Sequence, residues 1–255
     1  MKRTAALVGV TGGAGTTRLC VELGAILTHT GRDVVILDAA FATQGLAHHA
    51  PGRIDTDLTT LLTDENDLAN GLTDALIDHP VETPGRLALC PTYAPFERLA
   101  RAKGVDAVQR FETLIEILSN QFDHVLVDTP PVAANQSVAA VNAVDSIALV
   151  APASRSGSDA AQGMRGRLVD LGTNADSVIV NRVDGEHPLG DALAIPTDAT
   201  AAEDVPSSVP DLDTSFSPAI ATAAETVFDT TLAIDFPEEG LFDIDPDDYL
   251  PESLP

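Results

Sequence analysis

The sequence predicts an α/β fold: a doubly wound, mostly parallel sheet flanked by helices. Two observations predict this class. Six short runs of residues are continuously apolar, without the polar alternation of a half-exposed strand, so they predict strands covered on both faces. Segments of helical length separate the runs, and this alternation is typical of parallel strands joined by right-handed crossovers. The six runs are residues 4–10, 33–38, 86–90, 124–128, 146–152 and 177–181.

Three helices can be placed from signals of their own. The segment 17–30 is followed by Gly31, a residue type favoured just past a helix C-terminus. The segment 105–119 repeats apolar residues every three or four positions, which is the spacing of one helix face. Ser217 and Pro218 are the expected N-cap and first-turn residues of a last helix.

Charge is distributed unevenly along the chain. The 255 residues carry 14 basic and 39 acidic side chains, a net charge of −25. Residues 186–255 contain no lysine or arginine, and prolines and serines gather at 204–218, where we expect ordered structure to loosen. We therefore divide the chain into a folded domain at 1–232 and an acidic tail at 233–255, whose composition is that of a disordered segment.

The same composition argues against several classes of partner. So acidic a surface repels nucleic-acid backbones and anionic lipid. A composition rich in aspartate and poor in lysine is typical of halophilic proteins, because the Debye length falls to about 3 Å in molar salt. The two cysteines exclude a disulfide framework and fit a reducing compartment. No run approaches the length of a transmembrane helix, so we expect a soluble, cytoplasmic protein.

A glycine-rich loop follows the first predicted strand. Gly12, Gly13 and Gly15 lie within four positions, directly before a predicted helix. The backbone N–H groups of such a loop can curl into an anion-binding nest at the helix N-terminus. The other interpretation is a tight strand-to-helix turn without a ligand. A P-loop would carry lysine where this chain has Thr16, whereas Thr17 lies where a hydroxyl would reach a magnesium ion.

Further segments follow the order of the motifs of a known family. They are TGGAGTT at 11–17, DVVILDAAF at 33–41, FDHVLVDTPP at 122–131, VIVNRV at 178–183 and ALAIPTD at 192–198. Together they resemble the Walker A, switch, Walker B, base-reading and last-strand segments of the MinD/ParA family of deviant Walker-A ATPases. The resemblance covers residues 4 to about 232, and it implies a P-loop fold that binds ATP and Mg²⁺.

The resemblance also assigns roles residue by residue. It implies that the nucleotide is held by Gly12, Gly13, Ala14, Gly15, Thr16, Thr17 and Asn181, the last at the adenine-reading position. Magnesium would be held by Thr17 and, through a water molecule, by Asp128. Asp38 is the candidate catalytic residue, at the position of the first switch aspartate.

Three positions depart from the family's pattern. Thr11 and Thr16 replace its two lysines, and Ala40 replaces its second switch aspartate. Each loss removes a group that stabilises or activates the γ-phosphate, so we expect a degenerate Walker A site with weak binding and weak or absent hydrolysis. Arg18 lies one position after Thr17, on the predicted first helix, and has two interpretations: a substitute for the missing charge, or a solvated arginine of the first helical turn.

Three functions therefore stay open. The first is a weak ATP binder or pseudo-ATPase in spatial positioning or regulation, acting as a homodimer or through a protein partner that binds the acidic tail. The second is an active ATPase of the MinD/ParA type, in cell division, partitioning or positioning. The third is an interaction scaffold that binds no nucleotide. Membrane binding is not expected, because the family's membrane helix needs a basic face, which residues 186–255 lack.

Overall fold

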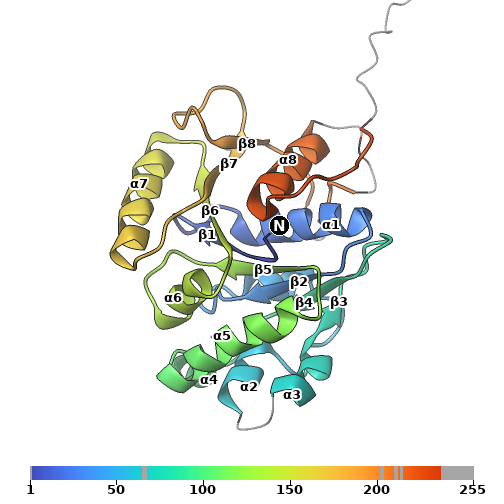
Figure 1. Cartoon of the computed structure of the whole chain (residues 1–255), viewed down its shortest axis with the longest axis vertical. Helices are drawn as coiled ribbons and strands as arrows, with labels where there is room; N and C mark the ends of the chain where they lie inside the picture. Colours follow the sequence, from blue (N-terminus) through green and yellow to red (C-terminus); the bar gives the residue numbers. More distant parts are fainter. Residues whose placement is uncertain (1, 65–67, 202–203, 210–211, 213–214, 237–255) are drawn as a thin grey trace, which may run out of the picture.

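A sheet of eight strands lies at the centre of the molecule (Figure 1). The computed structural model describes residues 2–64, 68–201, 204–209, 212 and 215–236. In space the strands follow the order β3-β4-β2-β5-β1-β6-β7-β8, and every neighbouring pair is parallel except β3 and β4. Their bounds are β1 Thr4–Gly9, β2 Val34–Asp38, β3 Ile77–Asp78, β4 Leu87–Cys90, β5 His124–Thr129, β6 Ser146–Pro152, β7 Ser177–Val183 and β8 Leu193–Pro196. The predicted α/β class is confirmed.

Helices cover both faces of the sheet, as a doubly wound fold requires. The α-helices are α1 Thr16–His29, α2 Leu58–Thr63, α3 Leu68–Ala75, α4 Phe96–Arg101, α5 Val105–Ser119, α6 Asn135–Asn142, α7 Arg155–Asp170 and α8 Phe216–Phe228, with a short 3₁₀ helix, η1, at Gly45–His49. The apolar side chains of α1 and α8 form the core on one face, and those of α2 to α7 form the core on the other.

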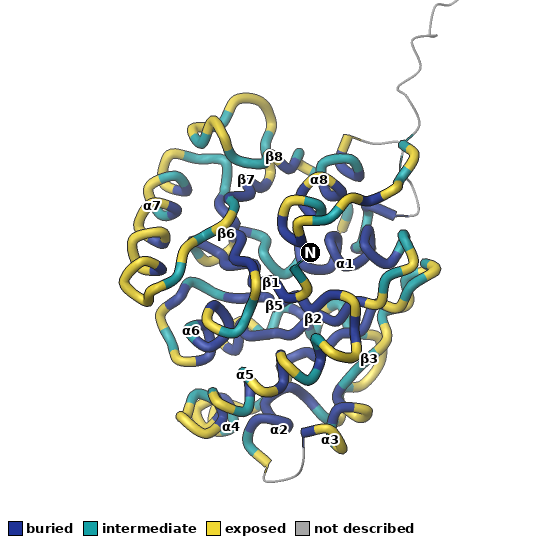
Figure 2. Tube along the Cα trace, viewed as in Figure 1, coloured by how far each residue is buried: buried dark blue, intermediate teal, exposed yellow. Residues whose placement is uncertain are grey.

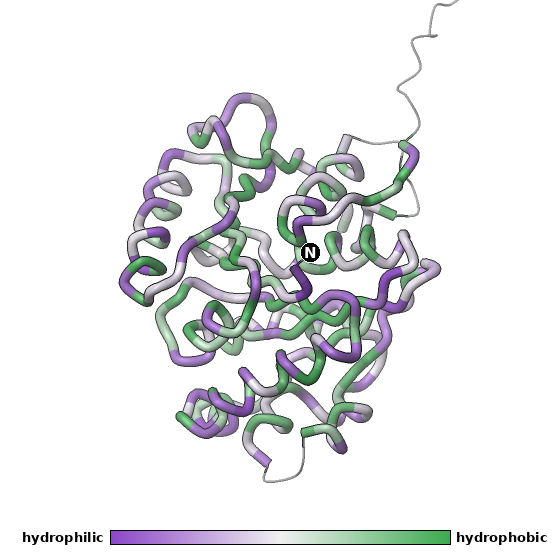
Figure 3. Tube along the Cα trace, viewed as in Figure 1, coloured by the Kyte–Doolittle hydropathy of each residue, from purple (hydrophilic) through white to green (hydrophobic). Residues whose placement is uncertain are grey.

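Two cores explain why the strands are apolar without alternation. On β1, Ala5 and Leu7 contribute to the core under α1 and α8, whereas Ala6 and Val8 contribute to the opposite core. Successive side chains of a strand point to opposite faces, so both faces must be apolar when both are covered. Figure 2 shows the central strands as buried, and Figure 3 shows that polar residues gather mainly on outer turns and loops.

Two local predictions are wrong. The last helix begins at Phe216, so Ser217 lies inside it instead of capping it. The Ser217 hydroxyl is used in a tertiary contact, a hydrogen bond of 2.8 Å to the carbonyl oxygen of Ser208. Ser208, Val205 and Val209 are buried, so the described residues 204–209 pack against the domain where loosening was expected.

The bounds of other elements agree closely with the sequence. The helix predicted at 105–119 is confirmed residue for residue, and α1 begins and ends one residue earlier than predicted. The two-residue strand β3 was not predicted. Of the expected acidic tail, residues 237–255 lie outside the described residues, and Ile234 and Phe236 pack against the core under α1 and α8. Within the described ranges, no helix is both long and apolar enough to cross a membrane.

The strand order indicates at which edge of the sheet a ligand would bind. β1 lies between β5 and β6, and the chain leaves β1 toward one side and β5 toward the other. In an open parallel sheet, ligands bind beyond the carboxyl ends of the strands where the strand order reverses. The glycine-rich loop, Asp38, Asp128 and Asn181 all lie at this edge.

Candidate functional site

The loop between β1 and α1 has the backbone of an anion nest. Gly13 has a φ of 76° and Gly15 a φ of 86°, left-handed values that turn successive N–H groups toward one side. Gly15 is also the residue that flanks the start of α1, whose first N–H groups have no partner within the helix. Within the described part of the chain, no protein acceptor takes a hydrogen bond from the backbone N–H groups of residues 12–15. The loop therefore presents a set of free donors at a helix N-terminus.

Thr16 folds back onto the loop instead of extending from it. Its Oγ1 atom lies so close to Gly9 that a Cβ atom on Gly9 would be 2.7 Å away. The short side chain therefore stays against the end of β1, whereas a lysine at position 16 would reach outward to a ligand.

Thr17 and Asp128 are brought together across the sheet edge. The Thr17 hydroxyl donates a hydrogen bond of 2.5 Å to Oδ2 of Asp128, at the end of β5. Asp128 neighbours Asp38 in the β2–β5 register, and both carboxyl groups are buried. A hydroxyl and a carboxylate are oxygen ligands of the kind that magnesium prefers.

Burial makes these two carboxyl groups weaker acids than usual. Burial and the nearby charge of Asp128 raise the pKa of Asp38 above its ordinary value, against the effect of three backbone N–H donors. Burial also raises the pKa of Asp128, and the Thr17 hydroxyl opposes the rise. Two carboxylates held this close cannot both ionise freely, so a divalent cation beside them would relieve their repulsion. The residues present therefore fit a magnesium site.

Asp38 accepts hydrogen bonds from the loop that follows β2 and from the loop that follows β4. Its carboxylate accepts backbone N–H groups from Ala40 at 2.9 Å, Leu46 at 3.3 Å and Thr92 at 3.4 Å. The Thr92 hydroxyl donates in turn to the carbonyl oxygen of Asp38. The carboxylate is thus occupied in holding two loops together, and Ala40 beside it offers no polar group.

The segment at Gln44 and Gly45 covers Thr17, which the sequence did not predict. A Cβ atom on Gly45 would lie 2.9 Å from Oγ1 of Thr17, so only glycine allows this approach. Gln44, with a φ of 52°, exchanges two hydrogen bonds with Ala94: its Nε2 donates to the carbonyl oxygen at 3.2 Å, and its Oε1 accepts the N–H at 3.1 Å. We call this pair the Gln44–Ala94 clamp.

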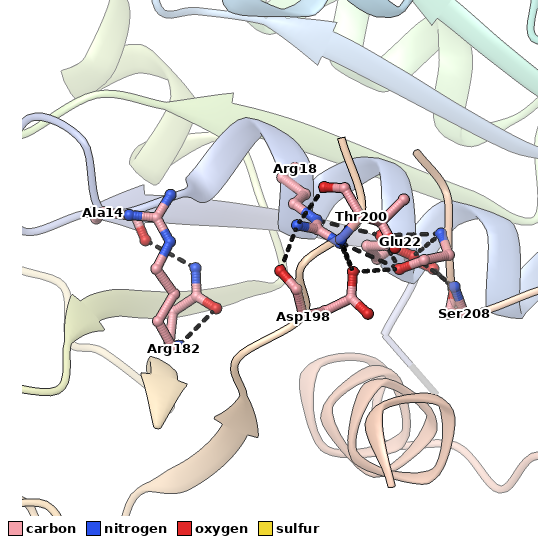
Figure 4. Close-up of polar contacts among 9 residues, drawn as sticks. Ala14, Arg18, Glu22, Arg182, Asp198, Thr200 and Ser208 are labelled. Carbon is pink, nitrogen blue, oxygen red and sulfur yellow. Dashed lines mark hydrogen bonds and ion pairs between the residues drawn. The ribbon is translucent and has the colours of Figure 1, made fainter. Parts of the chain in front are cut away.

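Asn181 and Arg182 lie on β7 and approach the glycine-rich loop, and Figure 4 shows the side chain of Arg182 beside Ala14. The Asn181 amide donates to the carbonyl oxygen of Ala14 at 2.9 Å and accepts the backbone N–H of Arg182 at 3.0 Å. A Cβ atom on Gly15 would lie 2.3 Å from the Asn181 amide nitrogen, so the loop and β7 are in close contact. The structure thus brings Asn181 to the loop, and its role in reading an adenine base stays a prediction.

Arg18 points away from the glycine-rich loop. Its guanidinium group donates to Asp198 and lies 3.4 Å from the buried carboxylate of Glu22 (Figure 4). Ser207 donates to both of these carboxylates. Neither interpretation from the sequence is therefore correct: Arg18 is part of a polar network, its side chain is 25% exposed, and its charge is matched by Asp198 and Glu22.

The comparisons with known proteins agree with this geometry. The model of a family described as AAA domain matches residues 2–168, which is more than half of the chain. No curated protein matches the sequence.

Several solved structures share the fold. The cell division ATPase MinD of Pyrococcus furiosus superposes with a TM-score of 0.72 at 20% identity, over 89% of this chain and 98% of that one. MinD of Pyrococcus horikoshii, complexed with Mg-ADP, gives 0.65 at 20% identity, over 78% of this chain and 82% of that one. A ParA family ATPase of Chlorobium tepidum gives 0.65 at 19% identity, over 78% and 86%. The chain therefore belongs to the AAA domain family and has the P-loop fold of the MinD/ParA ATPases.

Proposed function

We propose that this protein binds ATP or ADP together with Mg²⁺, weakly, and hydrolyses ATP slowly or not at all. The observation that carries the proposal is the combination of a complete backbone cradle with missing cations. The loop offers free N–H donors at the start of α1, and Thr17 and Asp128 form an oxygen site beside it. The lysine positions hold Thr11 and Thr16.

The preserved groups suffice for binding. Backbone N–H groups of a nest hold phosphate oxygens without any side chain. Asn181 lies at the loop edge, where its amide can turn from Ala14 toward a purine base. A magnesium ion, when bound, would neutralise phosphate charge, and Thr17 and Asp128 are the residues that would hold it.

The missing groups matter most for hydrolysis. Loss of a cation that stabilises the transferring phosphoryl group costs about 10³–10⁵ in rate, the value for an arginine finger. Loss of a group that positions the attacking water costs a further 10²–10⁴ or so. Ala40 cannot orient water, and the carboxylate of Asp38 already accepts three backbone N–H groups. Binding is thus weakened far less than turnover.

The cellular role that we propose is positioning or regulation through a homodimer or a protein partner. The names of similar folds support it: the Pyrococcus furiosus protein is a cell division ATPase, and an Aquifex aeolicus MinD is solved as a complex with MinC. For this chain the acidic segment 233–255 is the candidate contact with a partner. We propose neither a membrane nor a nucleic acid as partner, since the chain has 14 basic and 39 acidic residues.

The test is calorimetric titration of the protein with Mg-ATP and Mg-ADP, beside an assay of phosphate release, in about 2 M KCl to screen its self-repulsion. Gly15→Val is the control without a cradle, because a Cβ at Gly15 would clash with Asn181. We expect weak, magnesium-dependent binding that Gly15→Val abolishes, with phosphate release near background. Rapid turnover by the natural protein would favour an active ATPase, and no binding at all would favour a nucleotide-free scaffold; either result contradicts the proposal.

A further inference from the structure

We propose that Arg182 supplies the positive charge that the glycine-rich loop lacks, by contacting the phosphate groups of a bound nucleoside di- or triphosphate. The inference rests on the proposed nucleotide-binding function and adds to it the residue that reads the phosphate charge. The charge comes from β7, and not from position 16 of the loop, where the family's lysine is replaced by threonine.

The backbone of Arg182 is shaped to leave the sheet. The register between β7 and β8 shifts between Asn181 and Val183, so Arg182 is the residue that stands out of the ladder. Its φ of 60° is a left-handed value that is rare for a residue with a side chain. Such irregularities beside functional sites serve to re-aim a side chain, and their strain persists only where the surroundings impose it.

The side chain of Arg182 is aimed at the loop (Figure 4). Its Nη1 lies 3.5 Å from the carbonyl oxygen of Gly13, and its Nη2 would lie 3.6 Å from a Cβ atom on Gly15. The bond from Asn181 to Ala14 fixes the neighbouring residue of β7 against the same loop. The guanidinium group is thus held over the segment whose N–H groups are free.

The charge of Arg182 is also uncommitted, unlike that of Arg18. Arg18 is paired with Asp198 and Glu22. Arg182 is exposed, and among the described residues no carboxylate lies within ion-pair distance of it. In a chain with a net charge of −25, an unpaired guanidinium beside an anion nest is a specific feature.

The chemistry of this cation defines the class of ligand. A guanidinium group offers a planar fork of donors that matches phosphate oxygens and stays charged at every working pH. Its contribution grows with the negative charge of the ligand, so it favours a nucleoside di- or triphosphate over the bare nucleoside.

The experiment compares Arg182→Gln with Arg165→Gln in calorimetric titrations with Mg-ADP and with adenosine. Arg165 lines a surface cavity beside Asp176 and Ser177, at the amino end of β7, so its variant makes the same charge change away from the loop. We expect Arg182→Gln to weaken Mg-ADP binding about 10- to 100-fold, the range for one charge-assisted contact. Adenosine binding should stay unchanged, Arg165→Gln should match the natural protein, and Arg182→Lys should restore part of the loss.

A second variant separates charge from folding. Arg182→Gly removes the side chain at a left-handed position that glycine adopts without strain, so the fold should be at least as stable as before. This variant should lose Mg-ADP affinity to the same degree as Arg182→Gln. The proposal is overturned if either variant binds Mg-ADP like the natural protein, or if adenosine and Mg-ADP weaken equally, which would mean that Arg182 only braces the loop. Failure of the natural protein to bind Mg-ADP would instead contradict the proposed function itself.

Discussion

At position 16 the chain carries a small hydroxyl side chain that folds back against Gly9. Nothing in the surrounding backbone requires a threonine here: α1 starts at residue 16 itself, and Gly15, just before it, has a left-handed φ of 86°. We therefore expect the proposed phosphate cradle and the missing charge to be separable in this protein, so that a cation can be added at residue 16 without rebuilding the loop.

We expect Thr16→Lys to tighten Mg-ADP binding about 10- to 100-fold, because it adds one charge-assisted contact. Thr16→Gln, which adds length without charge, is the matched control and should change affinity little. Addition of Thr11→Lys and Ala40→Asp should then raise the rate of phosphate release above that of Thr16→Lys alone. A natural protein as fast as this triple variant would contradict the explanation.

A second residue, His124, makes stability depend on pH. It is buried at the start of β5 with its ring 4.3 Å from that of Phe228, and among the described residues its Nδ1 has no hydrogen-bond partner. Burial lowers its pKa to about 4, with the charge of Arg32 adding to the effect. The unfolded chain therefore binds the proton first as pH falls, and stability is lost between about pH 6.5 and pH 4.

His124→Phe should remove this loss, which amounts to about 3 kcal/mol at most for a shift of this size. The measurement is the free energy of unfolding in denaturant at several pH values, with the natural protein and the variant compared at each. Contributions from Asp38 and Asp128 are common to both chains and cancel. Parallel curves for the two proteins would show that His124 does not titrate as described.

At the scale of elements, the sequence predicted what local chemistry decides. Continuous apolar runs identified six of the eight strands, β8 was implied only by the family resemblance, and the glycine-rich loop and the strand-end aspartates followed from their order along the chain. Gln44 and Arg182 escaped prediction, because their importance lies in positive φ angles that only the structure shows. The packing of 204–209 escaped because its partner is 185 residues distant: Glu22 accepts the backbone N–H of Ser207.

Glu22 should therefore be the residue that holds this segment in place. Its fully buried carboxylate accepts N–H groups from Ser207 and Ser208, and its removal leaves buried donors without partners. We expect Glu22→Ala to lower the free energy of unfolding by about 3 kcal/mol, and Glu22→Gln to cost less. Glu116→Ala, at an exposed site on α5, is the control and should change stability by less than about 0.5 kcal/mol. Equal effects at the two sites would refute this role.

At the scale of the whole molecule, the net charge is the property that we expect to affect stability most. A net charge of −25 on 255 residues produces strong self-repulsion that only screening relieves. We expect the melting temperature to rise substantially between about 0.1 M and 2 M KCl, since the Debye length falls from about 10 Å to below 3 Å. Differential scanning calorimetry at a series of salt concentrations measures this directly. A flat or falling dependence would contradict the adaptation to high salt inferred from composition.

We expect the Gln44–Ala94 clamp to couple the segment that covers Thr17 to the segment that follows β4. Gly45 lies against the Thr17 hydroxyl, so a cation that takes that oxygen competes with Gly45 for space. A shift of Gly45 should pull on Gln44 and, through its two hydrogen bonds, on the segment that carries Tyr93, 62% exposed, and Phe96, 84% exposed, at the start of α4. The side chain at position 93 should therefore report optically on the proposed nucleotide site.

That readout can be tested cleanly because the chain contains no tryptophan. Tyr93→Trp places a single tryptophan on the clamped segment, and its emission should shift when Mg-ADP is added. With Gln44→Ala in the same chain the shift should disappear while Mg-ADP still binds, because the linkage has been cut and the cradle has not. An unchanged shift would mean that the signal travels by another route. If the shift does disappear, Gln44 is the residue that links occupancy of the site beside Thr17 to the exposed side chain at position 93.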